Sequence, residues 1–150
     1  MGSVAKLNIP KLVSNLTEKY NTRNPYELCK SLNIEIIEHD LKSAYGMYKL
    51  VKKNKFIFIN NKLDDTTKNF VLAHELGHAL LHKDSPGFYF KNHTLMKTSV
   101  YEIQANTFAA ELIIPNNYFE EALSYGYTMS QLSSAFNVPE DLIKLKLENW

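Results

Sequence analysis

The chain contains an H-E-x-x-H motif at His74-Glu75-Leu76-Gly77-His78. Two histidines four residues apart lie one turn apart on the same face of a helix, so both imidazoles can bind one metal ion. On a helical wheel Glu75 lies about 100° from His74 and about 60° from His78. Glu75 is therefore beside the metal but poorly placed to bind it, which favours a general base that acts on metal-bound water.

The motif lies in the middle of a helix that the sequence predicts from Asp65 to about His82. From Phe70 to Leu81, apolar residues surround almost the whole circumference of this helix, which is typical of a helix buried on all sides. Burying polar groups without partners costs several kcal/mol, so something must compensate the histidines and Glu75. A bound cation would do so. The alternative is that the histidines are hydrogen-bonded core side chains, and Glu75 then still needs a partner.

A third ligand is expected from a second helix, predicted from Ser99 to about Ile114 and ended by Pro115. Glu102 is the acidic residue on its inward face, 24 residues after His78, which is enough chain to turn back. The alternative role for Glu102 is an ion pair with a lysine. The wheel places Glu102, Ala105, Asn106, Ala109 and Ile113 on the inward face, and Gln104, Thr107 and Glu111 on the outward face.

Two further polar residues are candidates for positions close to the metal. Asn106 lies one turn after Glu102, where it can hydrogen-bond a metal-bound histidine; the alternative is an ordinary buried amide. His82 lies about 12 Å along the helix axis from His74, too far to share a metal easily with both motif histidines. His82 is therefore expected either to line the cleft or to pack beside the ligands.

Two segments together resemble the ImmA/IrrE family of metallopeptidases. The first runs from Phe70 through His82, and the second, from Glu102 to Pro115, matches the pattern E-x-x-A-N-x-F-A-x-x-L-x-x-P. Earlier segments, Asn24 to Leu28 and Tyr45 to Tyr48, look like the preceding helix and strands of the family, so the resemblance covers most of the chain. Gln104 is a departure, since many members have glutamate there; the wheel places it outward, away from the metal site.

The resemblance implies a zincin-like fold in which His74, His78 and Glu102 bind zinc and Glu75 is the catalytic base, as in a gluzincin-like metallo-endopeptidase. It also implies cytoplasmic proteolysis: short members from phages and integrative elements cleave helix-turn-helix repressors that keep the element silent. Two imidazoles and a carboxylate suit Zn²⁺ better than manganese or iron. The expected partner is therefore a protein substrate, with no direct binding of nucleic acid or membrane.

Peptide hydrolysis passes through a tetrahedral oxyanion, which needs a hydrogen-bond donor. Tyr89, His93 and Tyr101 are candidates for this role, and for each of them a loop or packing position is the competing interpretation. A substrate peptide could add to one edge of the sheet as an extended strand, although the sequence does not indicate which edge. The aromatic segment Phe88-Tyr89-Phe90 either lines the cleft or packs in the core.

Strand patterns come early in the chain and helical patterns late, which is typical of an α+β fold. Short β-branched or aromatic runs at 34–38, 45–48 and 56–59 predict a small antiparallel sheet of three strands, packed with about five to seven helices. Residues 116–150 predict a helical C-terminal subregion within a single domain, 1–150. The last helix is acidic and lacks arginine, which disfavours DNA recognition and favours packing or docking of the repressor.

Composition excludes several functional classes. The 150 residues are enough for one ordinary domain, and a net charge of +1 with a single arginine, Arg23, argues against nucleic acid as the main ligand. One cysteine, Cys29, excludes an internal disulfide and a four-cysteine zinc site. No apolar run has the length of a membrane span and no signal-peptide pattern occurs, so we expect a soluble, cytoplasmic protein.

Two functions remain open at this point. The first is a zinc endopeptidase that acts on a repressor-type protein. The second is a binding module whose zinc site is structural and which regulates a transcription factor or a toxin-like partner by contact alone. Glu75 favours the first, because a purely structural zinc site does not need that carboxylate.

Overall fold

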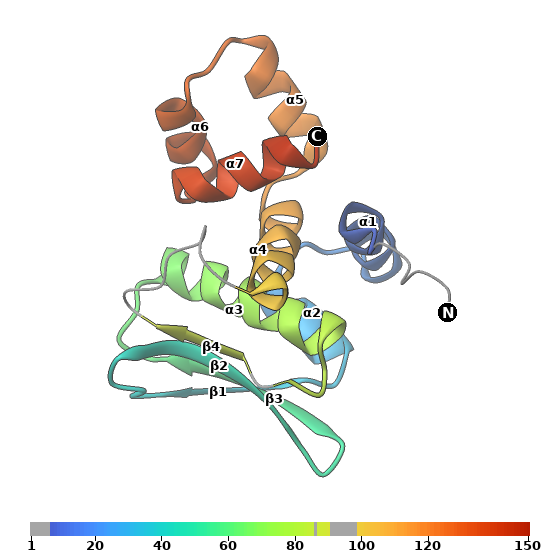
Figure 1. Ribbon diagram of the computed structural model, residues 1–150, viewed down its shortest axis with the longest axis vertical. Helices are drawn as coiled ribbons and strands as arrows, with labels where there is room; N and C mark the ends of the chain where they lie inside the picture. Colours follow the sequence, from blue (N-terminus) through green and yellow to red (C-terminus); the bar gives the residue numbers. More distant parts are fainter. Residues whose placement is uncertain (1–6, 86, 91–98) are drawn as a thin grey trace.

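The computed structural model of the chain describes residues 7–85, 87–90 and 99–150. These residues form a small sheet and seven helices (Figure 1), and this arrangement confirms the predicted α+β fold class. In chain order the elements are α1 (Ile9–Tyr20), α2 (Pro25–Ser31), β1 (Glu35–His39), β2 (Ala44–Val51), β3 (Asn54–Asn60), α3 (Asp65–Leu81), β4 (Gly87–Phe90), α4 (Val100–Ile113), α5 (Asn116–Ser124), α6 (Met129–Phe136) and α7 (Glu140–Glu148).

The described strands form one mixed sheet in the order β1-β3-β2-β4. The three predicted strands are present, but the sheet differs from the prediction in two respects. Strand β1 pairs with β3 in parallel, and β4 adds to β2 as a fourth strand. Lys52 and Lys53, with φ of 49° and 67°, form a tight hairpin that turns β3 back against β2. On its other side β3 pairs with β1, and these two strands run in the same direction.

Helix α3 lies between the sheet and helix α4 (Figure 1). All its residues from Phe70 to Ala79 are buried, as the apolar circumference predicts. Two glycines allow the neighbouring elements to approach this closely. A Cβ atom on Gly46 of β2 would lie 2.5 Å from Val71 Cγ1, and one on Gly77 of α3 would lie 3.2 Å from backbone atoms of Ala105 in α4. Any larger side chain at either position would push the layers apart.

Helix α4 is buried on more sides than predicted. Thr107 and Glu111, expected on the outward face, are only 7% and 6% exposed, because α1 and α7 also pack against α4. Glu111 forms a buried ion pair with Lys146 of α7, with 3.0 Å between Oε1 and Nζ. Arg23 donates hydrogen bonds to the carbonyl oxygens of Glu111 and Leu112 at the end of α4. A wheel of one helix cannot reveal the helices that cover its other faces.

Three short helices, α5 to α7, make up the C-terminal part of the fold, and α7 packs it against α4 (Figure 1). Thr128 and Gln131 form a capping box at the start of α6: each side chain accepts a hydrogen bond from the backbone N–H of the other residue. In the described part of the chain, no helix combines the length and the apolar content that a membrane crossing requires.

Candidate metal centre

Three side chains from two helices converge on one point. His74 and His78 lie one turn apart on α3, and Glu102 extends from the first turn of α4. Glu102 Oε2 is 3.1 Å from His74 Nε2, and Glu102 Oε1 is 2.9 Å from His78 Nε2. One donor atom from each residue lies within 4.8 Å of the other two. The structure thus brings together the three side chains that the sequence singles out as metal ligands.

Helix capping and close packing hold these groups in place. Ser99 caps α4 and its Oγ accepts a hydrogen bond from the backbone N–H of Glu102, at 3.3 Å. Asp64 caps α3 in the same way through the N–H of Thr67, at 2.7 Å. Gly77, next to His78, removes the side chain that would otherwise keep α4 at a distance. The separation between the two helices is therefore set by the residue that lies between the motif histidines.

Gly77→Ala is expected to lower the free energy of unfolding, although alanine is the better helix former by about 1 kcal/mol. The neighbouring atoms are the Cβ of Phe108, at 3.1 Å from the new Cβ, and backbone atoms of Ala105, at 3.2 Å, and these can move only with α4 itself. Overpacking of this kind costs about 1–3 kcal/mol. Because Glu102 moves with α4, metal affinity should fall as well. Chemical denaturation and zinc titration measure the two effects.

The control for this variant is Gly126→Ala. Gly126 has a φ of 74° and open space around it, so alanine there strains the backbone without separating any helices. We expect reduced stability and unchanged metal affinity from the control. Equal metal affinity in wild type and Gly77→Ala would show that the approach of the two helices does not set the geometry of the cluster.

The hydrogen bond of His74 shows that the cluster fits a cation. Its Nδ1 donates to Asn106 Oδ1 at 2.7 Å, because a carbonyl oxygen can only accept. A neutral imidazole protonated at Nδ1 has a lone pair on Nε2, and that nitrogen faces a Glu102 oxygen at 3.1 Å. Two lone pairs this close repel each other unless a cation lies between them. Zn–N and Zn–O bonds of about 2.0–2.2 Å place neighbouring ligands at roughly such separations, so the donor set fits a divalent ion.

The protonation states also suit metal binding. Burial lowers the pKa of His74, although the neighbouring carboxylate of Glu102 acts in the opposite direction. Burial by itself would raise the pKa of Glu102, but the imidazoles of His74 and His78 beside it outweigh that effect and hold the pKa well below its usual range. Neutral imidazole and ionised carboxylate are the forms that bind a metal.

Glu75 is fully buried on α3, and among the described residues neither of its carboxylate oxygens has a hydrogen-bond partner. Burial, and then the charge of Glu102, raises the pKa of Glu75 well above its usual range. Gly46 of β2 lies beside it, since a Cβ there would be 3.5 Å from Glu75 Cγ. Such an isolated buried carboxyl is costly to the fold and is typical of a functional site.

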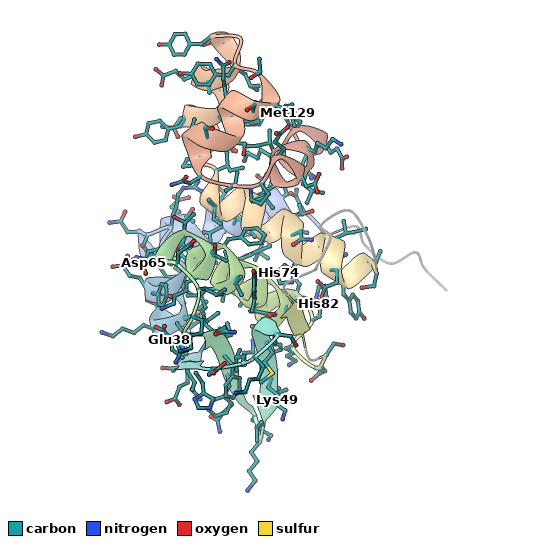
Figure 2. All side chains as sticks on the ribbon, turned by 90° about the vertical axis from the view of Figure 1, so that its left-hand side faces the viewer. Glu38, Lys49, Asp65, His74, His82 and Met129 are labelled. Carbon is teal, nitrogen blue, oxygen red and sulfur yellow. The ribbon has the colours of Figure 1, made fainter. Side chains whose placement is uncertain are left out.

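His82 is the C-cap residue of α3 and lies two turns after His74, at the end of the same helix (Figure 2). Its Nδ1 is 3.3 Å from His78 Nδ1, and its ring stacks on Tyr101 with 4.2 Å between the ring centroids. Gln104 does not simply face outward as expected, because its Oε1 accepts a hydrogen bond from His82 Nε2 at 2.6 Å. This contact depends on where α3 ends relative to α4, which no wheel of a single helix gives.

Two of the candidate oxyanion donors, Tyr89 and His93, have side chains outside the described part of the structure. The backbone of Tyr89 belongs to β4 and pairs with Gly46 of β2, but its side chain is not among those described. His93 lies outside the described residues altogether. The segment from Phe88 to Phe90, expected to line the cleft or to pack, forms the backbone of β4.

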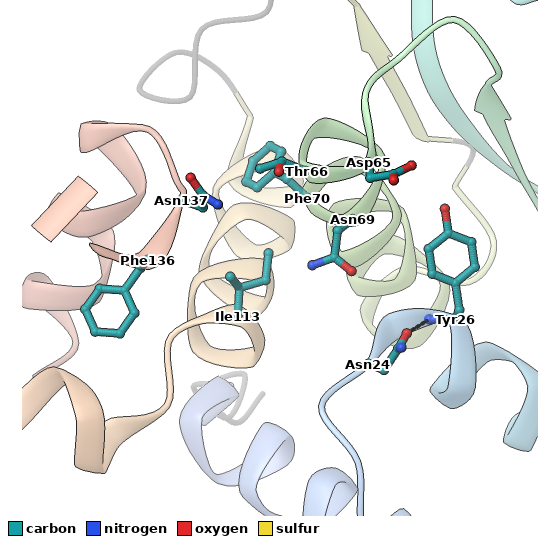
Figure 3. A pocket seen from close by; sticks show the side chains of 9 residues that line it. All are labelled: Asn24, Tyr26, Asp65, Thr66, Asn69, Phe70, Ile113, Phe136 and Asn137. Carbon is teal, nitrogen blue, oxygen red and sulfur yellow. Dashed lines mark hydrogen bonds between the residues drawn. The ribbon is translucent and has the colours of Figure 1, made fainter. Parts of the chain in front are cut away.

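A cavity of about 470 Å³ lies apart from the cluster (Figure 3). Phe70 lines this cavity and also lies near the cluster, with 6.5 Å between its ring centroid and that of His74. Neither motif histidine nor Glu102 lines the cavity, so its volume does not mark the candidate metal centre. Its lining residues are Asn24, Tyr26, Asp65, Thr66, Asn69, Phe70, Ile113, Phe136 and Asn137.

The chain matches a family model and two known relatives. The model of the IrrE N-terminal-like domain, Peptidase M78, matches residues 29–148. "Uncharacterized immunity region protein 2" of Bacillus phage phi105 is 39% identical over 139 residues, which cover 92% of this chain and 88% of the relative. "Metallopeptidase ImmA" of Bacillus subtilis (strain 168) is 36% identical over 139 residues, which cover 90% of this chain and 81% of the relative. With its H-E-x-x-H helix and second motif helix facing each other, this chain belongs to the ImmA/IrrE family, the M78 peptidases.

Proposed function

We propose that this chain is a zinc-dependent endopeptidase that cleaves a helix-turn-helix repressor of a phage or mobile element. The observation that carries the proposal is the buried carboxyl of Glu75, which has no hydrogen-bond partner among the described residues, beside three convergent donor groups. The relative from Bacillus subtilis is named a metallopeptidase, which supports peptide hydrolysis. The relative from phage phi105 is named an immunity region protein, which agrees with a repressor as substrate. A DNA-bound repressor places the reaction in the cytoplasm.

In this mechanism His74, His78 and Glu102 hold the zinc ion. When bound, zinc supplies a Lewis acid that acidifies water and polarises a peptide carbonyl. With zinc bound, its positive charge would oppose the effect of burial on the pKa of Glu75 and favour the ionised carboxylate. Glu75 would then take a proton from the attacking water as the water oxygen adds to the carbonyl carbon. The same carboxyl then gives this proton to the amide nitrogen as the carbon–nitrogen bond breaks. Its burial beside the cluster excludes bulk water and suits a group that exchanges one proton with the substrate.

The sheet offers an edge on which an extended substrate can bind. The described sheet ends at β1 and β4, and only β4 is adjacent to β2, where Gly46 lies next to Glu75. A peptide that adds to β4 through backbone hydrogen bonds would therefore pass nearer to Glu75 than one that adds to β1. We therefore propose β4 as the edge strand on which the substrate binds, a choice that the sequence alone does not make.

Removal of the metal is expected to abolish cleavage, and Zn²⁺ to restore it. The substrate to use is the helix-turn-helix repressor encoded nearest to this chain, incubated with chelated and with zinc-reloaded protein and analysed by mass spectrometry. Mg²⁺ is the control, because it prefers oxygen ligands and should not replace zinc at two imidazoles. A repressor that stays intact but binds the zinc-loaded protein would contradict the proposal and favour regulation by contact.

A further inference from the structure

A chain of hydrogen bonds runs from the surface of α4 to the candidate metal centre. Gln104 contacts His82 at 2.6 Å, and His82 contacts His78 at 3.3 Å. His78 in turn presents its other nitrogen, Nε2, to Glu102 at 2.9 Å. His82 therefore lies on the opposite side of the His78 ring from the point where the three donor groups converge. This position excludes His82 as a fourth ligand in the observed geometry.

The order of donors and acceptors in this chain follows from the groups themselves. Gln104 presents its carbonyl oxygen, which can only accept, so His82 donates from Nε2. A neutral imidazole with its proton on Nε2 has a lone pair on Nδ1. His82 Nδ1 then accepts from His78 Nδ1, and His78 is left with a lone pair on Nε2. That is the tautomer in which His78 can bind a metal through Nε2.

We infer that Gln104 and His82 form a positioning relay that fixes the tautomer and the ring orientation of His78, and that residue 104 thereby sets the metal affinity of the site. The inference rests on the proposed function, because it takes His78 as a metal ligand. A metal-binding histidine usually donates its second N–H to a carboxylate or a carbonyl oxygen. His78 instead donates to a second imidazole, whose own orientation is fixed by Gln104 and by stacking on Tyr101.

The relay explains why the residue type at position 104 matters to a site that it does not touch. A carboxylate accepts a hydrogen bond about twice as strongly as a neutral amide. Glutamate at 104 would make His82 a better acceptor for the proton of His78, and His78 a more basic ligand. The glutamine of this chain therefore gives a weaker metal site than glutamate would. The effect passes through His82, so it requires the ring nitrogens of that residue.

The relay is tested by measuring metal affinity in a double-mutant cycle. We expect Gln104→Leu and His82→Phe each to weaken Zn²⁺ binding by about 10- to 100-fold, the range found for outer-shell partners. Gln104→Glu should tighten binding by several-fold in the wild-type background and leave it unchanged in the His82→Phe background. Affinities come from Co²⁺ titrations followed by visible absorption, with Zn²⁺ competition against a chelator.

Two controls separate the relay from simpler effects. Ile103→Glu adds the same charge at the neighbouring, exposed position, where it does not replace the Gln104–His82 contact, and should change affinity little because that charge is screened. His82→Phe keeps an aromatic ring to stack on Tyr101, so a role in packing alone predicts unchanged metal affinity for this variant. Thermal unfolding of the metal-free variants confirms that each one is folded.

The possible outcomes distinguish the relay from the function on which it rests. Tightening by Gln104→Glu that persists in the His82→Phe background would overturn the relay, as would wild-type affinity in His82→Phe. If the wild-type protein binds zinc and cleaves its substrate, the proposed function stands even when the relay is overturned. Failure of the wild-type protein to bind zinc at all would overturn both. In the zinc-loaded protein, long-range ¹H–¹⁵N correlations should show His78 protonated at Nδ1 and His82 at Nε2.

Discussion

Glu75→Gln is expected to abolish peptide cleavage while zinc remains bound. Glutamine has nearly the same shape as glutamate but cannot accept a proton from water, and the loss of a general base lowers rates by about 10²–10⁴-fold. The structure adds a second expectation. Because the carboxyl of Glu75 is buried without a described partner, its loss removes no stabilising contact, and the free energy of unfolding should not fall. Initial cleavage rates, zinc content and chemical denaturation measure the three quantities.

Glu120→Gln is the matched control for this variant. Glu120 is exposed on α5, so the same chemical change there should leave cleavage, zinc content and stability at wild-type values. Cleavage by Glu75→Gln at the wild-type rate would remove Glu75 from the mechanism. Loss of zinc together with activity would show that Glu75 holds the metal or its ligands, and would contradict its role as the base.

The parts of the site that the sequence predicts well are those that depend on local spacing. His74 and His78 are placed on one face by the geometry of a single helix, and the apolar surroundings of that helix indicate its burial. Glu102 is found because it is the acidic residue on the inward face of a helix that begins at Ser99. Asn106 follows from the same face, one turn later. Each of these inferences uses one helix at a time, and the structure brings the four side chains together.

The parts that the sequence does not predict depend on contacts between distant segments. The parallel pairing of β1 with β3 joins two strands that strand β2 separates in the sequence, and no local pattern specifies it. Glu111 looks exposed until α7 covers it with Lys146. Gln104 looks outward until the end of α3 brings His82 against it. In each case a polar side chain or strand edge has a partner that only the packing of whole elements reveals.

Lys146→Met is expected to destabilise the protein strongly without affecting metal affinity. The Lys146 side chain is fully buried; its Nζ donates to Glu111 Oε1 at 3.0 Å and to Asn116 Oδ1. Burial lowers the pKa of Lys146, and the charge of Glu111 opposes this effect. Methionine fills a similar volume but leaves the carboxylate of Glu111 buried without its cation. Removal of one partner from a buried ion pair costs about 3–5 kcal/mol.

Arg23 limits this loss, because its guanidinium lies close enough to Glu111 to act on its charge. We therefore expect a decrease in unfolding free energy near the lower end of that range, measured by chemical denaturation. The double variant Lys146→Met with Glu111→Leu removes both charges and should recover most of the stability. Lys144→Met, at an exposed position of the same helix, should change stability by less than about 0.5 kcal/mol. A double variant no more stable than Lys146→Met alone would show that the unpaired carboxylate of Glu111 is not the source of the loss. The stability of α7 would then depend on the contacts of Lys146 with Asn116 and with the rings of Phe119 and Trp150.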